Sequence, residues 1–452
     1  MLRRSRRCGR RSTSSGPSLD RPSPPGLVFC GDDFTGASDT LATLARAGWR
    51  TRLYLDAEDA LADPASRALD AVGVATALRS LAPGPMAAEL DRQARALAAF
   101  GAPVFHYKVC STFDSSPTIG NIATAVATVR AAVPAIGWLA IVGGQPSLRR
   151  YCLFGNLFAA AGDGAVHRID RHPVMGHHPV TPMTEADLRL HLAAQGLEGV
   201  ALIDRRHYAD GVAALAELVH GLRAEGRDAV LFDAGEQADL PVVGAMLRDQ
   251  PGPVLCVGAS SVAEAVVAAA APRADVGATA PPALKRTARP CFALSGSRSP
   301  VTERQIAAAT GFREVPIDPQ GLATDRRAGI AAAVAASLDL LRQGRPVLAR
   351  LLPGARHGLS GAALAEATAE IAAAVTTSGL CGALVVAGGD TSSLAARALG
   401  LRSLTYVSDV DRGAALCRAD AEGPLDGFPL VLKGGQMGSE DFFGRVQAVL
   451  ER

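Results

Sequence analysis

Short apolar runs alternate along this chain with Ala- and Leu-rich stretches that repeat with the period of a helix. Residues 27–30 are predicted to form a buried strand, and residues 37–45 have a helical periodicity that ends at Gly48. Similar apolar runs return farther along, at 52–55, 229–232, 254–257, 292–294, 347–351 and 384–387. Because strands that alternate with helices are typical of β-α-β units, the pattern predicts an α/β fold. We expect two domains, each built on a mostly parallel sheet flanked by helices.

A change of character between residues 271 and 290 indicates where the two domains join. Four prolines interrupt this weakly periodic stretch. We therefore expect a first domain over 27–275, a linker over 276–289 and a second domain over 290–452. The first 26 residues hold seven arginines and a Ser/Pro/Gly-rich stretch, which predicts a disordered basic tail. An organelle transit peptide and a misassigned start are the alternatives for this segment.

Composition narrows the class of protein. With 452 residues, of which 48% are hydrophobic and 20% charged, the chain has enough apolar surface for compact cores. Its 46 basic and 44 acidic groups give a formal net charge of +2, too small to attract a polyanion, so we expect no nucleic-acid partner. The longest uncharged apolar stretch, 133–144, falls short of the roughly 20 residues that span a bilayer, so we expect no membrane partner.

Cysteine usage indicates the compartment. The eight cysteines are widely spaced, and none forms a Cys-x-x-Cys motif. This pattern favours buried free thiols in a reducing environment. We therefore expect a cytoplasmic protein.

Two adjacent aspartates, Asp32 and Asp33, follow the first predicted strand and precede a helix. Ligands bind at the carboxyl ends of strands in open α/β sheets. One carboxylate is expected to accept a proton from a substrate hydroxyl, while its neighbour orients that hydroxyl or meets a metal. A capping turn is the alternative, and because the two aspartates are adjacent, this loop lacks the Asp-x-Asp spacing of a haloacid-dehalogenase nucleophile.

Three more polar loops also follow short apolar strands. Residues 106–116 combine a lysine, hydroxyls and a carboxylate, a mixture that is costly to bury unless it faces a polar ligand. Residues 79–80 and 145–150 repeat this arrangement, contributing Arg79 and Arg149. Four such loops at one sheet edge would surround a small anion, and a solvated surface loop is the alternative for 106–116.

Four histidines lie between residues 167 and 178. Their spacing matches no zinc motif, and Pro173 and Pro179 break any helix there. A structural role is favoured, with substrate contact or a metal site as alternatives.

Three Gly-rich turns follow apolar strands in the second half of the chain. Glycines let backbone N–H groups approach phosphate oxygens, and helices that open at such turns add a positive dipole end. The sequence contains no Walker A loop and no G-x-G-x-x-G motif, so the common nucleotide signatures are excluded. We expect a phosphate cradle, although any one turn alone is equally an ordinary tight turn. Its candidate residues are Ser295, Gly296, Ser297, Gly388, Gly389, Asp390, Thr391, Ser392, Lys433, Gly435 and Gly438.

Taken together, these segments resemble the four-carbon acid sugar kinase family over roughly residues 27–452. The resemblance rests on 32–37, 295–297, 388–392 and 433–435, and the segments 110–115, 120–122 and 178–184 most resemble the 3-oxo-tetronate kinase branch. The chain differs from that branch at three places. In the substrate loop 146–150 the branch usually has an Asn-Gly-Arg-like sequence, and at Gly434 and Met437 it more usually has Ser and Phe. Asp390 stands where Glu is commoner.

The resemblance implies a substrate domain followed by a nucleotide domain, and ATP-dependent phosphorylation of the terminal hydroxyl of a four-carbon sugar acid. It implies that Asp33, with Asp32 as its rival, orients or deprotonates the attacking hydroxyl. The acid would be held by Thr35, Arg79, Lys108, Ser111, Asp114 and Arg149. ATP would lie on the Gly-rich turns with Mg²⁺ bridging its phosphates, and Lys433 either reaches a phosphate or is a strand-end charge.

All of this requires the loops of the first half to face the glycine turns of the second half across a shared gap. A non-catalytic sugar-acid sensor and a phosphatase-like hydrolase are the alternative functions. The sequence does not distinguish 3-oxo-tetronate, threonate and erythronate as the substrate. A homodimer is one alternative for the oligomeric state.

Overall fold

The computed structural model describes residues 24–178, 180–248, 250–270, 282–285, 287–353 and 358–451. Nearly all of the predicted N-terminal tail lies outside these residues, as does part of the predicted linker at 276–289. The predicted domain boundaries therefore stay predictions.

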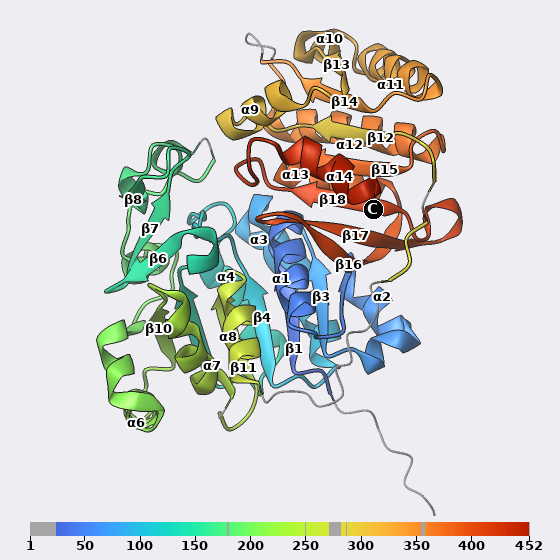
Figure 1. Ribbon diagram of the computed structural model, residues 1–452. Helices are drawn as coiled ribbons and strands as arrows, with labels where there is room; N and C mark the ends of the chain where they lie inside the picture. The colour runs from blue at the N-terminus through green and yellow to red at the C-terminus, as the bar shows by residue number, and fades with distance from the viewer. Residues whose placement is uncertain are drawn as a thin grey trace, which may run out of the picture.

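Strands and helices alternate along the described chain (Figure 1). The strands are β1 (Leu27–Gly31), β2 (Thr51–Tyr54), β3 (Ala71–Ala75), β4 (Val104–Lys108), β5 (Trp138–Gly143), β6 (Arg150–Leu153), β7 (Asn156–Ala160), β8 (Val166–Arg168), β9 (Ala201–Ile203), β10 (Ala229–Asp233), β11 (Val254–Gly258), β12 (Cys291–Ser295), β13 (Arg313–Ile317), β14 (Val347–Leu351), β15 (Ala383–Ala387), β16 (Leu401–Asp411), β17 (Ala414–Ala421) and β18 (Pro429–Lys433). The helices are α1 (Phe34–Arg46), α2 (Ala57–Ala62), α3 (Pro83–Ala98), α4 (Ile122–Ala132), α5 (Leu188–Ala193), α6 (Gly211–Ala224), α7 (Leu240–Arg248), α8 (Ser261–Ala269), α9 (Pro300–Ala308), α10 (Pro319–Thr324), α11 (Arg326–Arg342), α12 (Gly361–Thr377), α13 (Gly389–Ala398) and α14 (Phe442–Glu451).

The predicted α/β class is confirmed, and the strands of the first half form a parallel sheet in the order β2-β3-β1-β4-β11-β5-β10-β9. Successive residues of β1 belong to two different apolar clusters: Leu27 and Phe29 pack with α1, α7 and α8, whereas Val28 and Cys30 pack with α3 and α4. This alternation follows from the two-residue period of a strand. Helices therefore cover both faces of the sheet, as expected for a parallel sheet.

The second half forms its own sheet in the order β13-β14-β12-β15-β18-β17-β16. Its first five strands are parallel, β17 pairs antiparallel with β18, and β16 pairs antiparallel with β17. The last strand, β16, also pairs antiparallel with β2 of the first half through Ser403↔Tyr54 and Leu404↔Leu53. The two sheets are thus joined edge to edge into one sheet of 15 strands.

A small antiparallel sheet, β6-β7-β8, extends from the first half between β5 and β9 in sequence. In Figure 1 it rises at the left toward α9 of the second half. Residues of this sheet and of α9 line a common cavity of about 850 Å³, so the small sheet contributes to the interface between the two halves.

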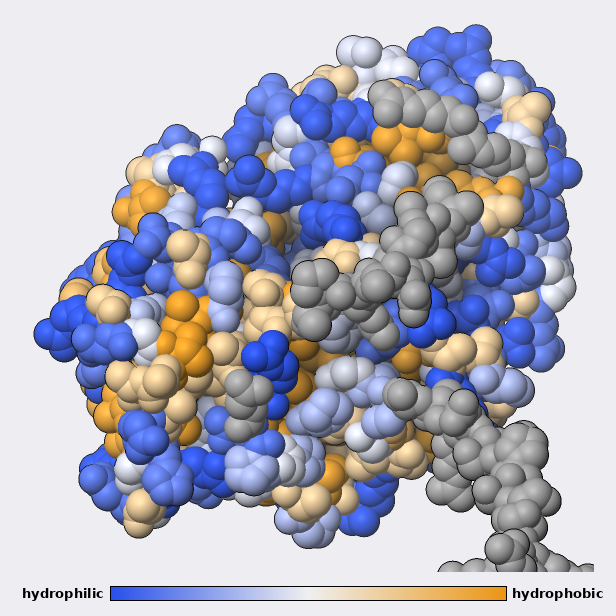
Figure 2. Space-filling view, turned by 60° about the horizontal axis from the view of Figure 1, so that its bottom comes forward, coloured by the Kyte–Doolittle hydropathy of each residue, from blue (hydrophilic) through white to orange (hydrophobic). Residues whose placement is uncertain are grey.

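The cysteines and the surface agree with the composition. The seven cysteines within the described ranges are free thiols, and six of them are buried. Figure 2 shows hydrophilic side chains spread over the visible face with apolar groups between them. Among the helices that the structure describes, none is long and apolar enough to cross a membrane.

Candidate active site

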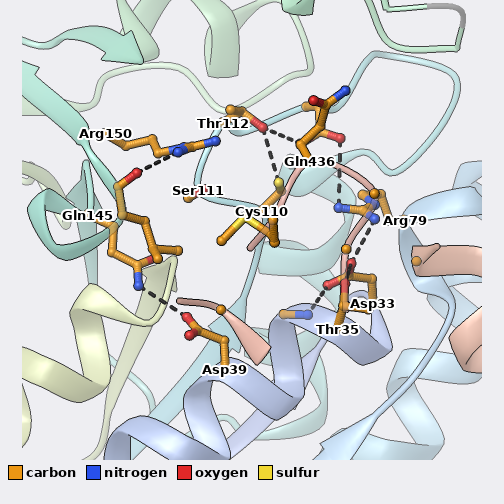
Figure 3. Close-up of a pocket in the computed structure, with 18 of the residues that line it drawn as sticks. Asp33, Thr35, Asp39, Arg79, Cys110, Ser111, Thr112, Gln145, Arg150 and Gln436 are labelled. Atoms are coloured by element: carbon orange, nitrogen blue, oxygen red, sulfur yellow. Dashed lines mark hydrogen bonds and ion pairs between the residues drawn. The ribbon is translucent and has the colours of Figure 1, made fainter. Parts of the chain in front are cut away.

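A pocket of about 260 Å³ lies where loops of the two halves meet (Figure 3). The first half lines it with the predicted acceptor residues Asp33, Thr35, Arg79, Lys108, Ser111 and Asp114. The second half lines it with Gly389, Gly413, Gly434, Gly435, Gln436 and Met437. The structure therefore brings the charged loops and two of the three predicted glycine turns to one shared space.

Asp33 is the centre of the charged side of the pocket. Its Oδ2 accepts hydrogen bonds from Thr35 Oγ1 at 2.9 Å and from Arg79 Nη2 at 2.8 Å, and its Oδ1 accepts the N–H of Gly36 at 3.0 Å. The same carboxylate is the N-cap of α1, so the predicted capping turn and the predicted polar site are one structure. Lys108 Nζ lies 3.7 Å from Asp33 Oδ1.

The two adjacent aspartates have opposite electrostatic environments. Burial raises the pKa of Asp33, but the charges of Arg79 and Lys108 and the hydrogen bonds it accepts outweigh burial and lower that pKa to about 2. For Asp32, burial dominates over Arg79 and raises the pKa to about 7. Asp32 Oδ1 is buried and has no hydrogen-bond partner among the described residues, and Asp32 does not line the pocket. Asp33 is thus the better placed of the two candidates.

Residue 36, in the first turn of α1, has no room for a side chain. A Cβ at this position would overlap with Lys108 Nζ and with Asp33 Oδ1. The ammonium group of Lys108 therefore lies directly against the helix backbone. Only 4% of Lys108 is exposed, so its side chain has little room to move elsewhere.

The loop after β4 is held in a strained conformation. Phe113 has a φ of 54°, a left-handed value that bulky residues seldom adopt. The backbone oxygen of Phe113 is bonded by Ser115 Oγ at 2.9 Å and lies 3.1 Å from His191 Nε2. This anchoring leaves Thr112 to donate to Asp114 at 2.8 Å, and Asp114 lies 3.7 Å from Arg79 Nη1. Arg79 consequently bridges the carboxylates of two loops.

On the other side of the pocket, α13 begins at Gly389, directly after β15. A Cβ on Gly389 would lie 3.5 Å from Arg79 Nη2 and 3.7 Å from Asp33 Oδ2, so the helix N-terminus abuts the charged loops. Gly388 has a φ of 131°, which only glycine adopts easily. The free N–H groups and the dipole of such a helix end favour a bound anion.

The loop after β18 is fixed by hydroxyls of the Ser297 turn and of α9. Thr302 Oγ1 donates to the backbone oxygen of Gly435 at 2.8 Å, and Ser299 Oγ also donates to it. A Cβ on Gly435 would overlap with Ser297 Oγ. The turns after β12 and β18 therefore pack directly against each other.

The other predicted nucleotide residues differ in position. Ser295 and Ser392 are buried and bond the backbone of the turns, through the oxygens of Ser297 and Gly388. Thr391 packs against Gly296. Asp390 is exposed in the first turn of α13, and Gly438 lines the neighbouring 850 Å³ cavity.

Lys433 does not reach into the pocket. It is fully buried, and its Nζ donates to the oxygens of Gly434 at 3.0 Å and Met437 at 3.2 Å and to Thr302 Oγ1 at 3.3 Å. Burial lowers the pKa of this lysine to about 7. Its ammonium group binds backbone oxygens of the loop after β18. This position fits the predicted alternative, a charge at the end of a strand, better than a contact with a phosphate.

Arg149 lines the larger cavity rather than the pocket. Its φ of 61° turns the chain, and its Nη2 donates to the oxygen of Gly164 at 2.6 Å. The next residue, Arg150, lines both this cavity and the pocket. The sequence predicted this loop as part of the site, but it did not show which of the two arginines lines the pocket. The left-handed backbone of Arg149 decides which arginine does so.

Several pocket residues were not among the predicted site residues. They are Gly36, Asp39, Cys110, Thr112, Gln145, Leu148, Arg150, Val174, Met175 and His178 from the first half, and Gly413, Gly434, Gln436 and Met437 from the second. Gln145 Nε2 donates to Asp39 Oδ2 at 3.1 Å, linking α1 to the loop after β5. Most of these residues lie within or next to the predicted loops. Their place in such a loop, rather than their residue type, is the feature of the sequence that could have identified them.

The histidines have mainly structural contacts. His172 Nδ1 lies 3.1 Å from the N–H groups of both Val174 and Met175, and His178 Nδ1 accepts the N–H of Thr181 at 3.1 Å. Within the described ranges, no group of three or more His, Cys, Asp or Glu residues is arranged to hold a metal ion. His178 also lines the pocket, which leaves substrate contact open for that residue.

Comparison with known proteins extends over both halves. Residues 27–266 match the model of a sugar-binding N-terminal domain, and residues 292–443 match that of a nucleotide-binding C-terminal domain. The chain belongs to the four-carbon acid sugar kinase family. The two matched domains of this family are the two halves that line the pocket.

Relatives within the family resemble the chain over nearly its whole length. It is 37% identical to a 3-oxo-isoapionate kinase of Paraburkholderia graminis, over 93% of this chain and 94% of that protein. It is 34% identical to a 3-oxo-tetronate kinase of Methylobacterium radiotolerans, over 92% and 96%. A crystal structure of a Salmonella typhimurium LT2 protein, 24% identical, shares the fold with a TM-score of 0.76 over 93% of this chain and 98% of that one.

Proposed function

We propose that this protein transfers the terminal phosphoryl group of ATP to the terminal hydroxyl of a four-carbon 3-oxo sugar acid. The observation that carries the proposal is that Gly389, at the N-terminus of α13, lies so near the Asp33–Arg79 pair in one pocket that a Cβ on it would be within 4 Å of both side chains. A phosphate bound by that helix end would lie next to an acceptor hydroxyl bound at Asp33.

Asp33 positions the acceptor. Its low pKa keeps it ionised at neutral pH, so it accepts a hydrogen bond from the hydroxyl and takes up the proton as the new O–P bond forms. The bond between the terminal phosphorus and the bridging oxygen breaks, and ADP leaves. Phosphoryl transfer has a loose transition state that depends mainly on positioning and charge, so a weak base in a fixed place is sufficient.

The glycine turns would bind ATP through backbone N–H groups. Mg²⁺ usually keeps several waters and binds through substrate phosphates with one or two carboxylates. Asp33 and Asp114 both face Arg79, and the described residues offer no group of three acidic or histidine ligands. This donor set fits a Mg²⁺ ion that arrives with the nucleotide, where it would neutralise phosphate charge beside Asp33.

The acceptor class follows from the relatives and from the pocket. Both relatives compared above are named as kinases of 3-oxo acids. A pocket of about 260 Å³ that contains three arginine or lysine side chains suits a small anionic sugar. Buried free thiols suit a reducing compartment, so we propose that the protein works in the cytoplasm. The homodimer stays a prediction.

A coupled assay tests the function directly. The purified protein is incubated with MgATP and one of 3-oxo-tetronate, 3-oxo-isoapionate, threonate or erythronate, and ADP release is followed. We expect ADP only when a 3-oxo acid is present, together with an equal amount of phosphorylated acid. Binding of an acid without ADP release would identify a sensor. Release of phosphate from a sugar-acid phosphate without ATP would identify a hydrolase.

A further inference from the structure

The pocket contains three cationic side chains, and two of them are already neutralised. Arg79 pairs with Asp33 at 2.8 Å and lies 3.7 Å from Asp114, and Lys108 lies 3.7 Å from Asp33. Arg150 is the third, and no described carboxylate lies within ion-pair distance of it. The pocket therefore has one guanidinium group whose charge is available to a ligand.

Arg150 is held in an environment that is unfavourable for an uncompensated charge. Its Nη1 donates to the backbone oxygen of Leu148, while its Nε is buried and has no hydrogen-bond partner in the part of the chain that the structure describes. Burial lowers the pKa of Arg150, and it outweighs the effects of Cys110 and Asp114, which raise that pKa, while the like charges of Arg149 and Arg412 add to the lowering. Arg150 as a whole is half-buried, and a guanidinium group with a buried, unpaired Nε and no carboxylate beside it is costly, so an anionic ligand would lower that cost.

The position of Arg150 complements that of Asp33. Figure 3 shows Arg150 reaching into the pocket from one side, toward Ser111 and Thr112, whereas Asp33 and Thr35 lie on the opposite side. A short chain that spans the pocket would place one end at each group. Arg150 matches a carboxylate, since its planar group of N–H donors pairs with two oxygens at once.

We propose that Arg150 binds the carboxylate of the acceptor and thereby selects which end of the sugar acid meets Asp33. This inference rests on the proposed function. It assigns Arg150 as the residue that makes the enzyme specific for acids over neutral four-carbon sugars. It also replaces Arg149 in that role, because Arg149 lines the neighbouring cavity and not the pocket, whereas Arg150 lines both.

Arg150→Gln and Arg150→Lys test the assignment with two acceptors. One is the 3-oxo acid, and the other is a four-carbon ketose with a hydroxymethyl group in place of the carboxylate. Loss of a buried charge contact typically costs enough to weaken binding about 30-fold or more. We expect Arg150→Gln to raise KM for the acid by that factor with kcat little changed, and to leave KM for the ketose unaltered. Arg150→Lys should recover part of the affinity for the acid.

Two further variants make the test specific. Arg168→Gln is the matched control, since Arg168 is an arginine of the same small sheet whose guanidinium pairs with Asp170 at the surface. It should behave as wild type. Equal losses on acid and ketose in Arg150→Gln would show a structural role and overturn the proposal. Loss of acid preference in Arg149→Gln instead would also overturn it.

Calorimetric binding of the acid without ATP separates this proposal from the proposed function. If the wild type binds the acid but transfers no phosphate, the kinase function fails. The assignment then still stands if Arg150→Gln abolishes that binding, and it falls if the variant binds the acid as tightly as the wild type. Failure of the wild type to bind any of the acids would overturn both.

Discussion

The two sides of the pocket are built from different chemical groups. The side from the first half uses charged side chains, with Arg79 and Lys108 both paired with Asp33. The side from the second half uses glycine turns and a helix N-terminus, and its lysine, Lys433, is buried beneath the loop. Side-chain charge thus faces backbone N–H groups across one gap.

This difference separates the two binding tasks. Charged side chains can recognise a particular pattern of hydroxyls and carboxylate, whereas backbone N–H groups bind the phosphates common to all nucleotides. Removal of a charged group from a side chain should therefore impair the acceptor side more than the nucleotide side. Addition of a single Cβ can test each side separately, because Gly36 on the charged side and Gly435 on the glycine side both lack room for one.

The largest effect is expected from Asp33→Asn. The variant keeps the shape of the side chain but removes the negative charge that orients the hydroxyl, so kcat should fall by about 10² to 10⁴. Calorimetry should show ATP affinity nearly unchanged, because the glycine turns are intact. Asp91→Asn, which alters an exposed ion pair with Arg95, is the control. Wild-type turnover in Asp33→Asn would exclude the role.

Asp32→Asn should show that Asp32 affects stability in a way that depends on pH, unlike the catalytic role predicted for Asp33. The folded-state pKa of Asp32 is raised to about 7, so its protonated form favours the folded state, and this stability is lost as pH rises through 7. The variant should be nearly as stable as wild type near pH 4. Its advantage should then grow by about 1.4 kcal/mol per pH unit and level off above pH 7. Urea unfolding at several pH values measures this, and a difference independent of pH would contradict it.

Gly36→Ala should damage the acceptor side alone. The new Cβ would displace Lys108 or Asp33 from their present contact, and overpacking of this kind costs about 1–3 kcal/mol. KM for the acid should rise and kcat should fall, with KM for ATP unchanged. Gly444→Ala, also in the first turn of a helix but with open space around it, is the control. A rise confined to KM for ATP would refute the division between the two sides.

Gly435→Ala should damage the nucleotide side alone, with a smaller effect. The added Cβ meets Ser297 Oγ, which can shift at modest cost, so ATP affinity should fall about tenfold, equivalent to about 1.4 kcal/mol. KM for the acid should stay the same. Gly361→Ala, where a Cβ has no neighbour within 4 Å, controls for the loss of a glycine. An unaltered affinity for ATP would show that the nucleotide does not lie on this turn.

The sequence predicted the strands and the loops well because both depend on local pattern. Parallel strands buried on both faces give continuous apolar runs such as β1 and β15, and the polar loops at their carboxyl ends stand out against those runs. The inward arginine was missed because the left-handed φ of Arg149 decides it. The burial of Lys433 depends on α9 and α14 packing over it, and these contacts are distant in sequence.

The edge pairing of β2 with β16 has a consequence for the independence of the two halves. Cutting the chain between them would leave β2 with a bare row of N–H and C=O groups, the feature that makes lone strands associate with other chains. Each lobe therefore serves as a protective cover for the other. A chimaera that exchanges one lobe for that of a relative must match this seam as well as the loops that hold the substrates.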